Sequence, residues 1–231
     1  NYNGNSGGAN RPGRCGDGSS GHDRGNRADN LEVVGLTSDQ RLICFDEKQP
    51  EDASTIGQIF GFVIDTKLVG IDFRPANGVL YGLGNAGGVY TLSLDTAQAT
   101  LRSRLNVALS GSFFGVDFNP TVDRLRIISD VGQNLRVNVE NGATTTDDPI
   151  NYTSGTPTSG VTAVAYTNND SDPNTVTTLY DIDSALDQVA VQAPPNNGSL
   201  NPTGKLNVDT TADVGFDIYS FVRDGSTDNV R

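Results

Sequence analysis

The 231-residue chain contains no Met, no Trp and a single His, His22. One His leaves too little material for a Ser-His-Asp or Cys-His nucleophilic site, or for a metal site with several His ligands. No apolar run reaches the ~18 residues that a membrane-spanning helix needs. Basic residues are also few, and a formal net charge of -12 argues against nucleic acid as a partner.

The absence of Met and the start at Asn1 predict that an upstream segment was removed after synthesis. A secretory signal is the usual segment of this kind. We therefore expect an exported protein, either secreted or held at the cell surface. The length suits one large all-β domain or two small ones, which bury roughly 70% of the surface of the unfolded chain.

Residues 1–30 differ in composition from the rest of the chain. They contain eight Gly and six Asn but no Val, Ile, Leu or Phe, and their net charge is +1 against -13 for residues 31–231. Such a segment cannot bury enough apolar surface to offset the entropy lost on ordering. The sequence therefore predicts a Gly/Asn-rich N-terminal extension, 1–30, followed by a folded domain, 31–231.

Short β-type runs, separated by Gly, Asn, Asp and Pro, fill the chain from Leu31 onward. Clear examples are residues 31–36, 89–94, 135–139 and 188–191. They are rich in Val, Leu and other strand-forming residues, and no window keeps a helical period for more than a turn or two. The fold class predicted is all-β.

An internal repeat organises these runs. Residues 70–75 (GIDFRP) recur as 115–120 (GVDFNP), then in degenerate form as 160–163 (GVTA), and finally as 215–218 (GFDI). The first two intervals are 45 residues and the last is 55. About four strands per ~45-residue unit is typical of β-propeller blades. Because the first and last units look incomplete, we expect four blades, or five with one incomplete.

The longest motifs resemble a known family. Residues 70–75, 80–83, 115–124, 129–138 and 178–183 are similar to a bacterial exported family, domain of unknown function 4394. The resemblance covers about residues 33–220. It implies a propeller-like fold without an assigned activity, and it supplies no catalytic residues.

The two cysteines, Cys15 and Cys44, form a disulfide if the protein is exported. Closing this loop constrains the unfolded chain and is worth ~3 kcal/mol. The bond would attach the N-terminal extension to the folded domain. Two unpaired thiols, or a bond to another chain, are the alternatives.

Asp72, Asp117 and Asp217 occupy equivalent places in three repeats. One hypothesis is that they line the central channel and bind a cation or a sugar. The alternative is structural, because an Asp at a strand end commonly bonds the turn that follows. A catalytic acid and base need unlike environments, which copies of one position do not readily supply.

Two acidic segments offer oxygen ligands that suit calcium. Asp170 and Asp172 lie in the loop 168–174, and Asp181 and Asp183 lie near Asp187. Neither segment matches the twelve-residue calcium loop with its Gly and terminal Glu. Solvated acidic side chains are the alternative, and no other cofactor is expected.

These observations predict a non-enzymatic structural or surface protein of the cell exterior. We expect homo-oligomers that form through residues 1–30, since a neighbouring copy offers that segment more contacts than its own chain. If such head-to-tail contacts between copies do not close into a ring, the copies assemble into a filament. The alternative is a propeller binding module for a glycan, small ligand or cation. A carboxylate-dependent hydrolase or lyase is disfavoured, because no asymmetric acid and base pair stands out.

Overall fold

The computed structural model describes residues 31–230, except 153–157, 169–171, 173 and 224–225. Antiparallel strands dominate this part of the chain, and its only helix is a single 3-10 turn, Pro195–Asn197. The fold is therefore all-β, as predicted. The described residues form two compact units, the first made of 31–60 with Ser93–Gln98 and the second of Gly61–Leu92 with the described residues from Ala99 onward.

The first unit contains a three-stranded antiparallel sheet, in the order β1-β2-β3. Its strands are β1 (Glu32–Leu36), β2 (Arg41–Asp46) and β3 (Gln49–Gln58). Leu42 and Cys44 are two residues apart on β2, so their side chains lie on the same face of the sheet. Both are buried, which identifies that face as the inner one.

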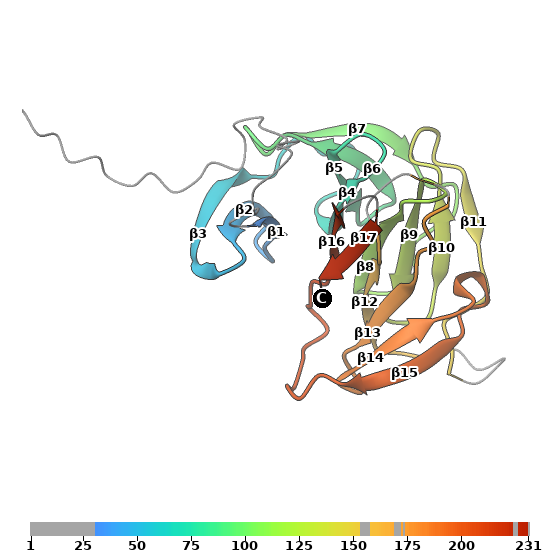
Figure 1. Cartoon of the computed structure of the whole chain (residues 1–231). Helices are drawn as coiled ribbons and strands as arrows, with labels where there is room; N and C mark the ends of the chain where they lie inside the picture. The colour runs from blue at the N-terminus through green and yellow to red at the C-terminus, as the bar shows by residue number, and fades with distance from the viewer. Residues whose placement is uncertain (1–30, 153–157, 169–171, 173, 224–225, 231) are drawn as a thin grey trace, which may run out of the picture. The chain divides into compact units, whose positions relative to one another are not determined.

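Three four-stranded antiparallel sheets and a hairpin make up the second unit (Figure 1). The first blade is β4 (Leu68–Arg74), β5 (Val79–Gly84), β6 (Gly88–Leu92) and β7 (Ala99–Arg104). The second is β8 (Phe114–Asn119), β9 (Arg124–Ser129), β10 (Asn134–Val137) and β11 (Thr144–Thr146). The third is β12 (Val161–Tyr166), β13 (Leu179–Asp183), β14 (Gln188–Gln192) and β15 (Leu200–Lys205). The hairpin is β16 (Tyr219–Arg223) and β17 (Ser226–Val230).

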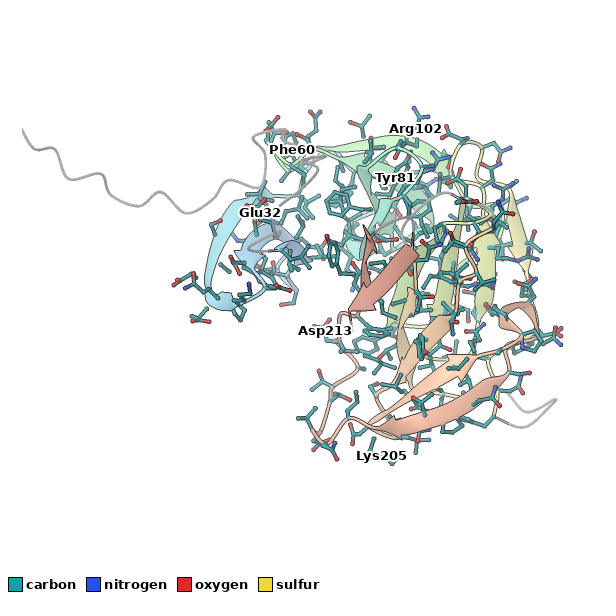
Figure 2. All side chains as sticks on the ribbon, in the orientation of Figure 1. Glu32, Phe60, Tyr81, Arg102, Lys205 and Asp213 are labelled. Carbon is teal, nitrogen blue, oxygen red and sulfur yellow. The ribbon has the colours of Figure 1, made fainter. Side chains whose placement is uncertain are left out.

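Blades of this kind, with strands in sequence order, define a β-propeller. Strand β4 packs against β8, and β8 packs against β12, so the first strand of each blade meets the first strand of the next. Side chains fill the space between the blades (Figure 2). Tyr81 of β5, for example, packs edge-on against Phe118 of β8 with ring centroids 5.3 Å apart. The predicted fold is confirmed.

Glycine permits the close approach of the first strands. A Cβ atom on Gly70 would lie 2.5 Å from Val116 Cγ2, and one on Gly115 would lie 2.8 Å from the backbone nitrogen of Val164. Real Cβ atoms do not approach other atoms this closely. The Gly that begins the repeat is therefore a packing requirement between neighbouring blades.

The position of the third repeat differs from the prediction. Tyr166 N–H makes the same inter-blade bond as Phe118 N–H, so the true copy is residues 163–166 (AVAY), three residues after the predicted GVTA. Ala163 replaces the Gly because the small side chain still fits, and Ala165 stands where the other copies have Asp. The fourth motif, 215–218, precedes strand β16 and lies outside it.

Candidate functional site

Two of the three repeat carboxyls meet at the first strands of the blades. The side chains of Asp72 on β4 and Asp117 on β8 are hydrogen bonded to each other. Asp72 Oδ2 also accepts the N–H of Phe118 at 2.6 Å, and Asp117 Oδ2 accepts the N–H of Tyr166. Each carboxyl therefore connects its own blade to the next one. For Asp72 and Asp117, the structural partner outside their own strand is the neighbouring first strand, whereas Asp217 bonds the residue that follows it.

Burial raises the pKa of both carboxyls. The pKa of Asp117, which is 8% exposed, rises well above its ordinary value, and that of the half-buried Asp72 rises to about 7. Two carboxyls at hydrogen-bond distance do not both ionise, so they share one proton. The two carboxyls therefore act as one coupled pair.

Asp217 provides a third negative charge beside this pair. Its charge raises the pKa of both Asp72 and Asp117. The Asp217 side chain accepts only the N–H of the adjacent Ile218, at 2.6 Å, and the residue is exposed. Within the described part of the chain, none of the three carboxyls forms an ion pair with Lys or Arg. The result is a carboxyl cluster with excess negative charge.

The predicted calcium ligands hold local structure. Asp172 Oδ1 accepts the N–H of Asn174 at 2.9 Å, while Asp183 binds the N–H of Ala185 at 3.1 Å and the hydroxyl of Tyr152 at 2.8 Å. The described residues include no group of three or more His, Cys, Asp or Glu side chains placed to bind one metal ion. Asp170 lies outside them, so calcium binding by that loop stays a prediction.

Asp181 is separate from the other predicted ligands. Its side chain on β13 has no solvent exposure, and neither carboxyl oxygen has a hydrogen-bond partner. Burial raises its pKa well above the ordinary value, and the charge of Arg126 opposes that rise. An unpaired carboxyl in such a place is stable only in its neutral form.

Arg126 of β9 forms a polar cluster between the second and third blades that the sequence analysis missed. The residue is 1% exposed, and its guanidinium donates to Tyr166 (3.2 Å), Asn134 (2.6 Å), Asp147 (2.7 Å) and Asn196 (2.9 Å). Asp147 also accepts two hydrogen bonds from Arg136. The one available signal was an Arg alternating with apolar residues in the buried run 124–129.

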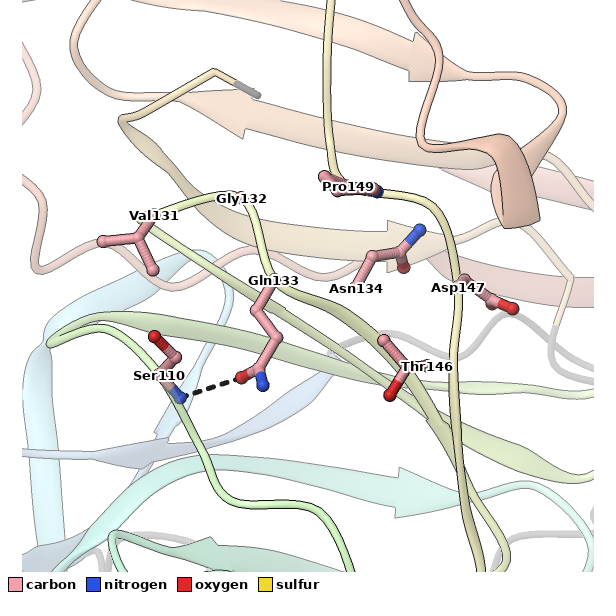
Figure 3. A pocket seen from close by; sticks show the side chains of 8 residues that line it. All are labelled: Ser110, Val131, Gly132, Gln133, Asn134, Thr146, Asp147 and Pro149. Atoms are coloured by element: carbon pink, nitrogen blue, oxygen red, sulfur yellow. Dashed lines mark hydrogen bonds between the residues drawn. The ribbon is translucent and has the colours of Figure 1, made fainter. Parts of the chain in front are cut away.

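A surface pocket of about 260 Å³ borders this cluster (Figure 3). Its lining consists of Ser110, Val131, Gly132, Gln133, Asn134, Thr146, Asp147 and Pro149. Ser110 N–H donates to Gln133 Oε1 at 2.9 Å and fixes one wall, while Arg126 holds Asn134 and Asp147 in another. The volume of this pocket is below the ~300 Å³ at which the usual range of small-molecule sites begins, so the pocket suits a small chemical group.

Two predictions depend on residues outside the described part of the chain. Cys44 lies on β2 and is 3% exposed, but its predicted partner, Cys15, is not among the described residues. The same holds for the extension 1–30 and its predicted role in self-association. Both stay predictions. In the part of the chain that the structure describes, no helix has the length and apolar character to cross a membrane.

The blades define the class of the protein, which is a β-propeller protein. The chain belongs to the family described as Domain of unknown function (DUF4394), whose model matches residues 41–229. This confirms the resemblance seen in the sequence, and the family carries no assigned activity. No curated protein matches the chain.

Solved structures resemble the chain at low identity. A protein of unknown function from Bacteroides thetaiotaomicron is 12% identical with a TM-score of 0.54, and the match covers 82% of this chain and 50% of that protein. An auxiliary nutrient binding protein from the same organism is 16% identical with a TM-score of 0.48, over 76% and 44%. The Malassezia sympodialis allergen Mala s 1 is 10% identical with a TM-score of 0.46, over 87% and 66%. The chain spans about half the length of the first two, and likeness at this level concerns the fold alone.

Proposed function

We propose that this protein is an exported propeller binding module whose ligand binds at the carboxyl cluster of Asp72, Asp117 and Asp217. One observation carries the proposal: the hydrogen-bonded carboxyls of Asp72 and Asp117 lie beside a third carboxyl, Asp217, and no basic side chain among the described residues forms an ion pair with any of them. Strongly perturbed carboxyls of this kind are concentrated at functional sites.

The chemistry of the cluster favours a ligand that donates hydrogen bonds or carries positive charge. An ammonium group, or the hydroxyl groups of a glycan, would compensate the excess negative charge. Asp217 is the member that a ligand reaches first, since it is exposed and bonds only to its own neighbour.

A hydrolase is the second candidate, and one observation favours it. Asp72 and Asp117 are hydrogen bonded to each other and share one proton, as a catalytic pair of carboxyls does. However, Asp117 is buried, and its Oδ2 binds the backbone of the next blade. A general acid or base must reach its substrate, so we favour binding over catalysis.

The test is a titration of purified protein with putrescine and maltotriose as organic probes and calcium chloride as the metal probe. Asp217→Asn removes the exposed charge without breaking an inter-blade bond, and Asp209→Asn alters an exposed Asp elsewhere as the matched control. We expect at least one organic probe to bind wild type and Asp209→Asn, and to bind Asp217→Asn at least tenfold more weakly. Equal affinity for all three proteins would contradict the proposal, and breakdown of maltotriose would favour the hydrolase.

Self-association through residues 1–30 is a separate proposal that concerns assembly. Its support is compositional, since this cationic segment accompanies an anionic domain. Deleting residues 1–28 and measuring particle mass by light scattering tests it. A smaller assembly is expected, and an unchanged mass would contradict it.

A further inference from the structure

Ile64 presents an apolar side chain to solvent on the loop that precedes β4. The residue is 76% exposed, and its backbone φ of 73° lies in the left-handed region. This conformation is strained for a β-branched residue, and such strain persists only where the surrounding structure imposes it. Strained residues of this kind are concentrated where proteins bind ligands and partners.

Hydrogen bonds hold the loop on both sides of Ile64. Before it, the hydroxyl of Tyr90 accepts the N–H of Val63 at 3.0 Å, and Arg104 Nη2 donates to the Val63 carbonyl at 2.6 Å. After it, Asp65 Oδ2 accepts from the Tyr90 hydroxyl at 2.7 Å and from Arg104 Nη2 at 2.9 Å. The loop is therefore a rigid support, and Ile64 forms an apolar knob on it.

The first strands of the first and second blades run in the same direction. A Cβ atom on Gly70 of β4 would contact Val116 of β8, and two residues further along Asp72 Oδ2 accepts the N–H of Phe118. Both strands therefore begin at the same face of the second unit. Ile64 lies just before β4 begins, so the knob belongs to this face.

The surface pocket lies at the same face (Figure 3). The N–H of Asp130 donates to the carbonyl of Phe113, which precedes β8, at 3.1 Å, and the adjacent Val131 lines the pocket. The pocket therefore flanks the start of β8 as Ile64 flanks the start of β4. Val131 is 50% exposed, and together with Pro149 it gives the pocket an apolar wall.

The larger polar side chains of the pocket already have partners. Gln133 accepts the N–H of Ser110, and Asn134 and Asp147 both accept from Arg126. An apolar group that enters the pocket therefore does not deprive these side chains of their hydrogen bonds. The volume of about 260 Å³ accommodates a branched side chain of four carbon atoms, which is what isoleucine has.

The charges beside the knob and the pocket are opposite. Lys67 follows Ile64 on the same loop, and Asp148 lies between the pocket residues Asp147 and Pro149. Lys67 and Asp148 are both exposed, and neither forms an ion pair within the described part of the chain. A second copy of this chain therefore offers the knob both an apolar pocket and a carboxylate.

We propose that two copies of this chain dimerise face to face, and that Ile64 of each copy inserts into the pocket of the other. Lys67 then pairs with Asp148 across the contact. Because the knob and the pocket lie on one face, a twofold axis repeats the same contact twice, which makes the interface isologous. The proposal is independent of ligand binding at the carboxyl cluster and of the N-terminal extension.

Sedimentation equilibrium of the full chain tests the dimer. We expect wild type to dimerise reversibly, and Ile64→Asp to raise the dimer dissociation constant about tenfold or more, because it places a charge in the apolar pocket. Val122→Asp is the matched control, since Val122 is 52% exposed on the turn between β8 and β9, and it should leave the constant unchanged. Ile64→Gly removes the knob and relieves the backbone strain, so it should weaken the dimer without lowering the thermal unfolding temperature.

A charge exchange tests the pairing across the contact. Lys67→Asp and Asp148→Lys should each weaken the dimer, and the double variant should recover most of the loss. A double variant no tighter than either single one would overturn the pairing.

Two results would overturn the dimer itself. One is a wild type that stays monomeric at about 1 mM. The other is a dissociation constant that Ile64→Asp and Ile64→Gly leave unchanged, which would assign any association to the N-terminal extension or to another surface.

Discussion

Two buried acidic sites in the same unit behave differently because of their partners. Asp72 and Asp117 bond each other and the backbone of the next blade, whereas Asp181 has no partner for either oxygen. Burial raises the pKa at both sites, but only at the first site do the carboxyl oxygens accept backbone hydrogen bonds, which oppose the rise. Burial alone therefore does not determine what a carboxyl does. The paired site connects neighbouring blades, whereas the lone site places an unsatisfied carboxyl in a buried face of the third blade.

Arg126→Ala is expected to have the largest effect, because it removes a buried cation that donates to four side chains and leaves Asp147 with one fewer donor. Breaking a buried ion pair in this way costs about 3–5 kcal/mol of unfolding free energy. Urea denaturation measures the loss. Arg124→Ala, on the same strand but bonded only to the carbonyls of Val122 and Asp123, is the control and should cost under about 1 kcal/mol. Similar losses in both variants would mean that the cluster is not a major source of stability.

Asp117→Asn should flatten the pH dependence of stability. A carboxyl whose pKa is raised in the folded state keeps a proton that the unfolded chain releases, so stability falls as pH rises. For the pair this fall begins near the ordinary value of 3.8 and ends above the value of about 7 for Asp72. Its slope is at most about 1.4 kcal/mol per pH unit for one proton. The amide introduced at position 117 keeps a donor for Asp72, so denaturation from pH 4 to pH 8 should give a flatter curve, and an unchanged curve would show that the pair does not share a proton.

Asp181→Leu should stabilise the protein by about 1–3 kcal/mol at pH 8, because it replaces an unsatisfied polar group with an apolar one of similar size. This gain in unfolding free energy should be smaller at pH 5. At that pH a larger fraction of the unfolded chains also carries the proton on Asp181, so keeping that proton in the folded state costs less. Thermal unfolding at the two pH values measures the difference. A loss of stability at both values would show that Asp181 has a partner that stabilises the interface.

Asp217→Asn should have the smallest effect. Removing its negative charge lowers the pKa of Asp72 by a fraction of a pH unit, since the proton there is held less strongly. Carboxyl carbon NMR titration of Asp72 follows this change. A rise in the pKa of Asp72 would mean that Asp217 acts on the pair through structure and not through charge.

The sequence predicted the blades because local patterns carry them. Strand-forming runs and the Gly-x-Asp-Phe motifs at Gly70 and Gly115 were sufficient, since the Gly is required where one blade approaches the next. The third copy was misplaced because Ala163 fits where Gly was expected. The Arg126 cluster was missed for a different reason: its partners Tyr166 and Asn196 are far away in the sequence, and no local pattern indicates that they meet.

The inter-blade bonds of the repeat Asp residues point in one direction along the chain. Asp72 binds the backbone of the second blade, Asp117 binds that of the third, and Ala165 has no carboxyl with which to continue. During synthesis each new blade therefore emerges after the side chain that will hold it. Folding can therefore proceed from the N-terminal side, with each folded blade offering a carboxyl to the backbone of the next one. This series of inter-blade hydrogen bonds ends at the third blade.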